Sequence, residues 1–442
     1  MMMKKRIRRR EAREALERIE LAGELVKVIR RFFPGLVDLL KQVHDPRHQS
    51  YISYKNHVLL MTRILSAIFY ISSMRKTSEE FNCQIVIENI GTLCGEKLEE
   101  LPYWETINQY LARIEPEELQ DKVCQIVKRL IRSRAFEDGR IRNRYWQIIV
   151  DGTQLVSSRK ELDGAYIYRV HNKGTENEYI EYCYYVLEAK IVLHNEIVVS
   201  IMTEFVENTD AEAKKQDCER KACSRLMERL KREFPRLPIC ICGDSLYACE
   251  SFFRECEKYG WRYILRYKEG SIPSIYREFQ DLQKLDGNRR GKSSDRGTFW
   301  YDFVNAIDYN GIKVNCLEYG ESWEKYPLYF LTDLVLGHKN AEATAADGRR
   351  RWAIENYGFN AQKKHGFYIE HLFSKNCQAM KNHYFLIQIA HMISQIMDAW
   401  NIWGPIQQSK EQKHRRILES WKHHRINRLI MSEPSSFQIR FT

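Results

Sequence analysis

Three acidic residues that are far apart in the chain have types and neighbours suited to phosphate chemistry. Asp151 follows the apolar run "YWQIIV", Asp244 follows "LPICICG", and each aspartate adjoins a glycine. Carboxylates at the ends of strands in an α/β sheet face the crevice where ligands bind. Either aspartate alone is explained as well by a turn. A third carboxylate, Glu355, lies in the helix-like stretch "RRRWAIENYGFNAQKKHG", where it is the only acidic side chain.

Carboxylates that converge repel one another unless a cation lies between them. Hard divalent ions such as Mg2+ prefer oxygen ligands and keep positions open for substrate phosphates. Two such ions, roughly 3.5–4 Å apart, stabilise the attacking and the leaving oxygen of an in-line phosphoryl displacement. Arg351 precedes Glu355 by four residues, so on one helix face it could bind phosphate oxygens. An exposed Arg–Glu helix pair would explain Glu355, but it would not explain the two aspartates.

The elements that must position these residues follow from the apolar spacing. Residues 1–135 show helical periodicity. From Trp146 the spacing predicts strands at "YWQIIVDGTQL", at two runs around "LHNE", at "LPICICGD" and at "WRYILRYK", with helices between them. This order predicts a mixed sheet flanked by helices. After Lys268 we expect a polar basic loop, "KLDGNRRGKSSDRG", then strands joined by a "YNG" hairpin turn. Helix returns near Thr344.

The sequence resembles a DDE insertion-sequence transposase of the cut-and-paste kind, in which a ribonuclease H-like catalytic domain carries a β-strand insertion before the final glutamate. "IIVDGTQL" matches the first aspartate motif, "ICGDSLYA" the second, and "RWAIENYGFNAQKKHG" the last. The resemblance implies that Asp151, Asp244 and Glu355 are catalytic and bind Mg2+ or Mn2+, as two ions. It also implies that Arg351 and Lys363 contact DNA phosphates.

The last motif departs from the family pattern of tyrosine, arginine, glutamate and lysine at two positions. Gly348 stands where the family has tyrosine, and Gln362 stands where it has lysine, with Lys363 one residue further on.

The resemblance implies four regions. These are a helical DNA-binding region over 1–135, a ribonuclease H-like core over 136–270 and 345–400, a β-rich insertion over 271–344, and a basic helical tail over 401–442. The fold class expected is therefore α/β, with a helical domain before the sheet and a helical tail after it.

Further DNA contacts are expected in and before the insertion. Arg289, Arg290 and Lys292 lie in its basic loop, and Lys268 follows the last core strand. In relatives of this architecture an insertion tryptophan stacks on a flipped base, which implies that role for Trp300. Packing into a small β core explains Trp300 equally simply, and a solvated strand end explains Lys268.

The charge of the chain favours a polyanionic partner. Net charge is +11, and residues 1–13 hold seven Lys/Arg against one Glu. Residues 410–428 hold seven Lys/Arg against two Glu. Such basic clusters are typical of nucleic-acid binding, although a solvated basic face is the alternative. No run of 18 apolar residues predicts a membrane span. The 12 cysteines show no disulfide or zinc spacing, which suits a reducing cytoplasm.

These observations predict a cytoplasmic, nucleoid-associated DNA transposase that cuts and joins strands at the ends of an insertion sequence. The resemblance implies a homodimer on double-stranded DNA. Two alternatives stay open: a metal-dependent DNA nuclease without strand transfer, and a domesticated or inactive DNA-binding relic.

Overall fold

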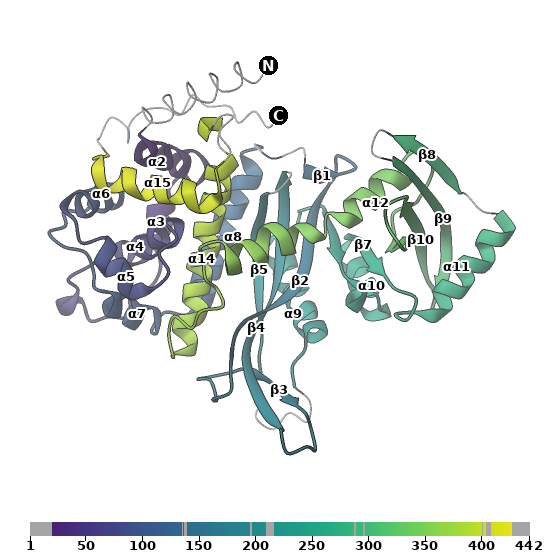
Figure 1. The fold of residues 1–442 in the computed structure, drawn as a ribbon, viewed down its shortest axis with the longest axis horizontal. Helices are drawn as coiled ribbons and strands as arrows, with labels where there is room; N and C mark the ends of the chain where they lie inside the picture. Colours follow the sequence, from purple (N-terminus) through teal and green to yellow (C-terminus); the bar gives the residue numbers. More distant parts are fainter. Residues whose placement is uncertain are drawn as a thin grey trace. The chain divides into compact units, whose positions relative to one another are not determined.

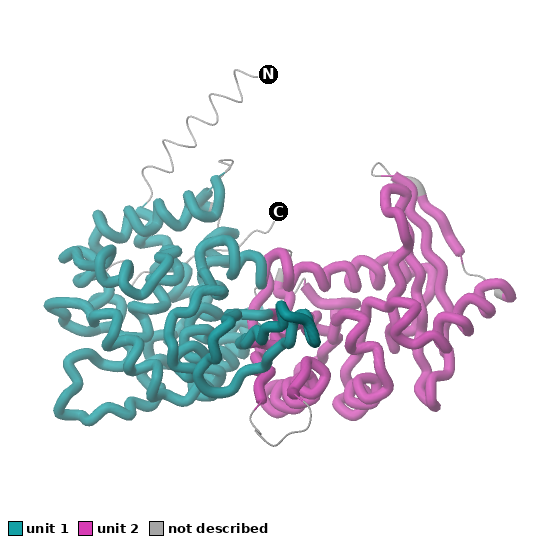
Figure 2. The backbone as a smooth tube through the Cα atoms, turned by 60° about the horizontal axis from the view of Figure 1, so that its bottom comes forward, with its two compact units in different colours: residues 1–136, 154–184, 359–442 teal, residues 137–153, 185–358 magenta. Residues whose placement is uncertain are grey.

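The computed structural model describes residues 20–134, 136, 139–194, 197–208, 216–286, 289–294, 297–399, 401–403 and 408–426. The chain divides into two compact units, coloured separately in Figure 2. Unit 1 holds residues 1–136, 154–184 and 359–442, and unit 2 holds residues 137–153 and 185–358. The basic cluster at residues 1–13 and the end of the tail after residue 426 lie outside the described residues.

Unit 1 is mainly helical (Figure 1). Helix α14 (Cys377–Ala399) packs against α4 (Asn56–Ile68) and α8 (Pro116–Arg132). All residues of α4 are buried, including Arg63, whose guanidinium is hydrogen-bonded to Ser66 and His383. Pro116 at the first position of α8, followed by two glutamates, favours the start of that helix. The other elements of the unit are α2 (Leu21–Phe32), α3 (Leu36–Lys41), η1 (Gln49–Tyr51), α5 (Met74–Glu80), α6 (Gln84–Cys94), α7 (Trp104–Leu111), β3 (Ile167–His171), α13 (Asn360–Lys364), η5 (Asn401–Trp403) and α15 (Lys410–His423).

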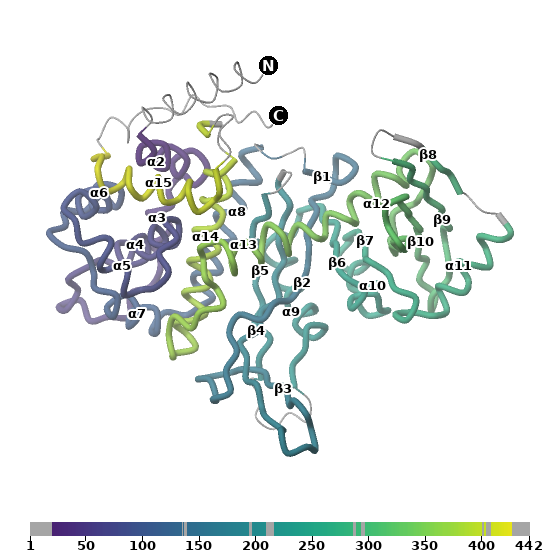
Figure 3. Tube along the Cα trace, viewed as in Figure 1, coloured from purple at the N-terminus to yellow at the C-terminus, as the bar shows by residue number. Residues whose placement is uncertain are grey.

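Unit 2 is built on a mixed sheet in which strands follow the order β4-β2-β6-β7-β11-β10-β9-β8, and β5 also pairs with β4 and β1 with β2. Strands β2, β6 and β7 are parallel, and the strands from β7 to β8 pair antiparallel. Figure 3 labels β2, β4, β6 and β7 and, further along the path, β10, β9 and β8. The strands are β1 (Arg140–Ile141), β2 (Tyr145–Ser158), β4 (Tyr179–His194), β5 (Ile197–Val206), β6 (Ile239–Gly243), β7 (Arg262–Tyr267), β8 (Arg290–Ser294), β9 (Gly297–Tyr309), β10 (Ile312–Glu321) and β11 (Leu328–Thr332).

The helices of unit 2 lie in the sequence between its strands or after the last of them. They are α9 (Glu219–Glu233), η3 (Ser245–Tyr247), α10 (Glu250–Tyr259), α11 (Pro273–Asp286), α12 (Ala341–Arg349) and the π-helix η4 (Ile354–Phe359). Every residue of β6 is buried, which fits its place between two parallel neighbours. The "YNG" turn is confirmed, because Asn310 and Gly311 both have positive φ angles between β9 and β10.

The predicted fold class is confirmed: a mixed α/β sheet with helices before and after it. The proposed division into four regions stays a prediction. No helix in the described part of the chain is long and apolar enough to cross a bilayer.

Three local predictions were wrong. The strand that carries Asp151 does not end there, since β2 continues to Ser158. The loop predicted over "KLDGNRRGKSSDRG" contains strand β8, because backbone pairing with β9 does not require apolar side chains at an edge. Helix α11 was missed in a block predicted as loop and strands; it begins with a proline, and Ile275 and Phe279 bury one of its faces.

Candidate active site

Asp151 and Asp244 occupy matching positions on neighbouring strands. Strands β2 and β6 run parallel, and their last paired residues are Ile149 and Cys242. Each aspartate stands two residues beyond its member of that pair. Because parallel neighbours lie about 4.8 Å apart, the two carboxylates belong to one end of the sheet. The two aspartates therefore stand at matching positions just past the last paired residues of β2 and β6, although β2 itself continues to Ser158.

The carboxylate of Asp151 is half-buried and has one cationic neighbour. Its Oδ1 accepts a hydrogen bond from the backbone N–H of Gly152 at 3.0 Å, and its Oδ2 lies 3.1 Å from Nη1 of Arg351. Burial raises the pKa of Asp151 to about 6; Arg351 opposes this rise, and the negative charge of Asp244 adds to it. Arg351 therefore offsets only part of the rise in the pKa of Asp151 that burial and Asp244 cause.

Asp244 also caps a turn. Its Oδ1 accepts a hydrogen bond from the N–H of Leu246 at 2.8 Å and so caps the short helix η3. A turn-forming role, which was the simpler explanation from sequence, is thus present. It uses Oδ1, and it is compatible with a ligand on the other oxygen.

Arg351 and Glu355 are not arranged as an α-helical i, i+4 pair. Glu355 lies in the first turn of the π-helix η4 and is exposed. Arg351 precedes that helix and contacts Asp151, a pairing that the sequence did not suggest. No three His, Cys, Asp or Glu side chains among the described residues are grouped closely enough to hold a metal ion. The structure thus brings the two aspartates and Arg351 together, but it does not gather Glu355 with them.

The two departures in the last motif are explained by packing. A Cβ atom at Gly348 would lie 2.5 Å from the ring of Phe330, so no tyrosine fits there without movement. Gln362 is fully buried, and its Nε2 donates to Oε1 of Gln388 at 2.8 Å. Lys363 is largely buried and lies 3.3 Å from the carboxylate of Glu370.

The basic residues of the insertion have local partners. The guanidinium of Arg289 lies 4.0 Å from the ring centroid of Trp300. The indole also packs on Gly320, where a Cβ would lie 2.4 Å from the ring. Lys292 forms an exposed ion pair with Glu342 at 2.8 Å. Packing of Trp300 on Gly320 is therefore present, whereas base stacking by Trp300 stays a prediction.

The remaining predicted contacts are simpler: Arg290 on β8 and Lys268 after β7 are both exposed.

One basic residue near Arg351 was missed by the sequence reasoning. Arg266 lies on β7, and its Nη1 donates to the carbonyl of Tyr329 at 3.0 Å. Burial lowers the pKa of Arg266, and the positive charge of Arg351 is among the smaller causes of the same decrease. The available signal was an arginine inside the apolar run "WRYILRY", which an ordinary buried strand would not contain.

Comparison with known proteins identifies the family to which the chain belongs. A family model described as a transposase DDE domain matches residues 142–393, just over half of the chain. No curated protein sequence matches the chain. Among solved structures, the chain is similar to a cryo-EM structure of the piggyBac transposase synaptic complex with hairpin DNA, at 10% identity and a TM-score of 0.38, over 95% of this chain and 83% of that one. The match to the family model includes Asp151, Asp244, Arg351 and Glu355, and the chain belongs to the transposase DDE domain family.

Proposed function

We propose that this DNA transposase cuts and joins DNA strands at the ends of an insertion sequence by metal-dependent phosphoryl transfer. The observation that carries the proposal is the matched position of Asp151 and Asp244 at one end of parallel strands, with Arg351 on Asp151. Crevices at the carboxyl ends of such strands are where α/β sheets bind ligands.

The donor set fits a hard divalent cation at the two aspartates. Burial and the charge of Asp244 both raise the pKa of Asp151, and a bound cation would relieve both effects. Members of the family generally use divalent ions. In our proposal Asp151, Asp244 and Glu355 hold Mg2+ or Mn2+, as two ions. Ions bound there would activate water and stabilise charge on the phosphate oxygens.

Arg351 has two roles in the proposal. In the DNA-free protein its guanidinium neutralises part of the charge at Asp151. On DNA the same planar group binds a phosphate oxygen pair, for which guanidinium geometry is suited. Exchanging a carboxylate partner for a phosphate partner keeps the arginine hydrogen-bonded throughout.

The wider DNA interface is proposed on charge. We assign Lys268, Arg289, Arg290 and Lys292 to the DNA backbone and Trp300 to base stacking. Lys363 is assigned to phosphate binding, which requires exchange of its contact with Glu370. A homodimer would hold both element ends, and a chain of this charge would associate with the nucleoid in the cytoplasm.

The test is cleavage of a duplex that carries the sequences flanking the gene, in Mg2+ or Mn2+. Wild-type protein is expected to cut at defined element ends and to join those ends to a second DNA, and Asp244→Asn is expected to do neither. Cutting without joining would support a nuclease. Metal-independent DNA binding that is unchanged in Asp244→Asn, without any cleavage, would support a DNA-binding relic.

A further inference from the structure

A further carboxylate, Glu219, lies next to Gly152, the residue that follows Asp151, and has no part in the sequence motifs of the family resemblance. It is the first residue of α9, and two tyrosine hydroxyls donate to it. Tyr185 on β4 donates to Oε1, and Tyr247, which directly follows the Asp244 turn, donates to Oε2 at 3.2 Å. The Tyr247 side chain is only 2% exposed. A glutamate that served only the helix dipole would need no such partners.

Both glycines that adjoin the aspartates make room for this arrangement. A Cβ at Gly152, next to Asp151, would lie 2.7 Å from the carboxyl carbon of Glu219 and 2.7 Å from the Tyr185 hydroxyl. A Cβ at Gly243, next to Asp244, would lie 2.7 Å from the ring of Tyr247. The glycines of the two aspartate motifs thus allow Glu219 and its tyrosine partner to approach the strand ends.

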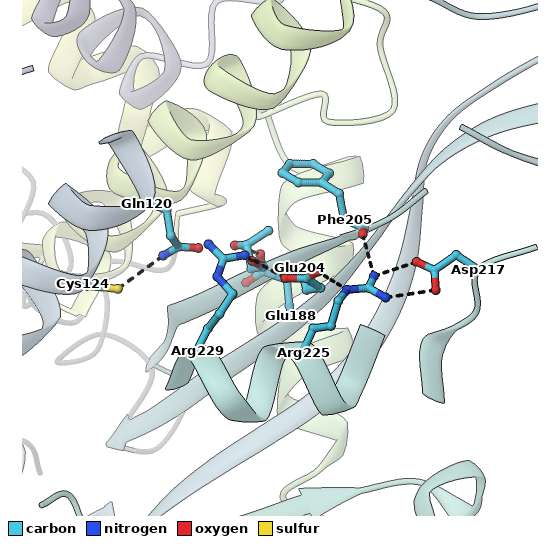
Figure 4. A network of polar contacts seen from close by, with 9 residues as sticks. Gln120, Cys124, Glu188, Glu204, Phe205, Asp217, Arg225 and Arg229 are labelled. Carbon is cyan, nitrogen blue, oxygen red and sulfur yellow. Dashed lines mark hydrogen bonds and ion pairs between the residues drawn. The ribbon is translucent and has the colours of Figure 1, made fainter. Parts of the chain in front are cut away.

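Helix α9, which carries Glu219, is held against the sheet by ion pairs. Figure 4 shows Arg225 and Arg229 of α9 directed at Glu204 of β5. Nε of Arg225 lies 2.6 Å from Oε1 of Glu204, and Nη1 of Arg229 lies 2.7 Å from Oε2. Arg225 also binds Asp217, just before the helix, at 2.7 Å. The two pairs with Glu204 hold the middle of α9 against the sheet, and the pair with Asp217 ties the helix to the segment before it.

We propose that Glu219 is a fourth carboxylate of the acidic site, whose negative charge, held in place by Tyr185 and Tyr247, strengthens the binding of a divalent cation at Asp151 and Asp244. The proposal rests on the proposed function, because it assumes that the cation binds at the aspartates. Its physical basis is that a fixed negative charge near a half-buried cation site is weakly screened. Groups that support metal ligands from behind typically change affinity 10- to 100-fold.

The test is the affinity of the full chain for Mn2+ without DNA, followed by electron paramagnetic resonance of the free ion. We expect Glu219→Gln to weaken Mn2+ binding about tenfold. Glu228→Gln is the matched control, since it removes the same charge from an exposed position of the same helix. Asp151→Asn identifies which bound Mn2+ belongs to the acidic site. Tyr247→Phe retains Glu219 and the ring, and should weaken binding about threefold because one fixing hydrogen bond is lost.

The outcomes separate the two proposals. If wild type binds Mn2+ in a manner that depends on Asp151, and both Glu219→Gln and Tyr247→Phe bind it equally well, Glu219 has only a structural role and the inference is overturned. The proposed function then stands. If Mn2+ binding does not depend on Asp151, the proposed cation site is wrong and the inference is overturned with it. Tyr247→Phe keeps the test decisive even if Glu219→Gln does not fold.

Discussion

The two halves of the acidic site are positioned by different kinds of structure. Asp151 and Asp244 stand on neighbouring parallel strands, where backbone hydrogen bonds set their register. Arg351 and Glu355 stand at the entrance of a π-helix, where the hydrogen-bond step is longer than in an α-helix. The longer step turns successive side chains away from the four-residue spacing. Strand register therefore brings the aspartates together in the free protein, whereas Glu355 stays exposed.

The largest expected effect tests the two aspartates that stand on parallel strands. Asp244→Asn should lower the rate of DNA cleavage at least about a thousandfold, because a ligand for the ion that stabilises the transition state is lost. The same variant should lose Mn2+ binding without DNA. A circular dichroism melt shows whether the variant is folded. Cleavage at the wild-type rate by the folded variant would remove Asp244 from the site.

The next effect concerns the departure at Gln362, just beyond the π-helix. Gln362→Lys restores the family residue, but it places a charge where the side chain is fully buried between glutamine and histidine partners. We expect the free energy of unfolding to fall by about 3 kcal/mol. Urea denaturation measures this change. Lys363→Gln is the matched control and should cost less than about 1 kcal/mol. An unchanged stability for Gln362→Lys would show that the position can open to solvent.

Glu355→Gln compares the π-helix part of the site with the two strand aspartates. We expect cleavage to fall about a hundredfold, with Mn2+ affinity in the absence of DNA changed less than twofold, since Glu355 is not grouped with the aspartates. Cleavage kinetics and Mn2+ titration are measured on one preparation. A loss of Mn2+ binding as large as that of Asp244→Asn would mean that the helical half is already assembled in the free protein.

The smallest expected effect is the pH dependence of Mn2+ affinity and of stability. Because the pKa of Asp151 is raised to about 6, protons compete with the cation below that pH. Apparent Mn2+ affinity should fall about tenfold per pH unit below 6 and be constant above it. Without metal, the raised pKa makes Asp151 stabilise the fold at low pH, and this contribution is lost as pH rises through 6. Asp151→Asn should abolish both trends, as titration calorimetry and thermal melts from pH 5 to 8 can show.

The positions of Asp151 and Asp244 could be predicted from the sequence. Apolar runs that end in Asp-Gly or Gly-Asp are local patterns, and strand pairing does the rest. The helical half was less accessible, because the π-helix and the contact between Arg351 and Asp151 depend on packing between segments 200 residues apart. Glu219 could not be predicted either, because its contacts also join segments that are distant in the sequence. Its tyrosine partners lie 34 and 28 residues away, and nothing at "DCERKA" marks it.

Strand β11 pairs with the edge of β7, so the ladder of the core continues without interruption through β10 and β9 to β8. Among the described residues the edge of the sheet on this side is therefore not β7 but β8, a strand of five residues that carries Arg290 and Lys292. Short, basic edge strands resist pairing with a second sheet. Strands β8 to β11 thus have a consequence for edge pairing: they move the sheet edge away from β6 and β7 and end it in a strand that disfavours pairing with another sheet.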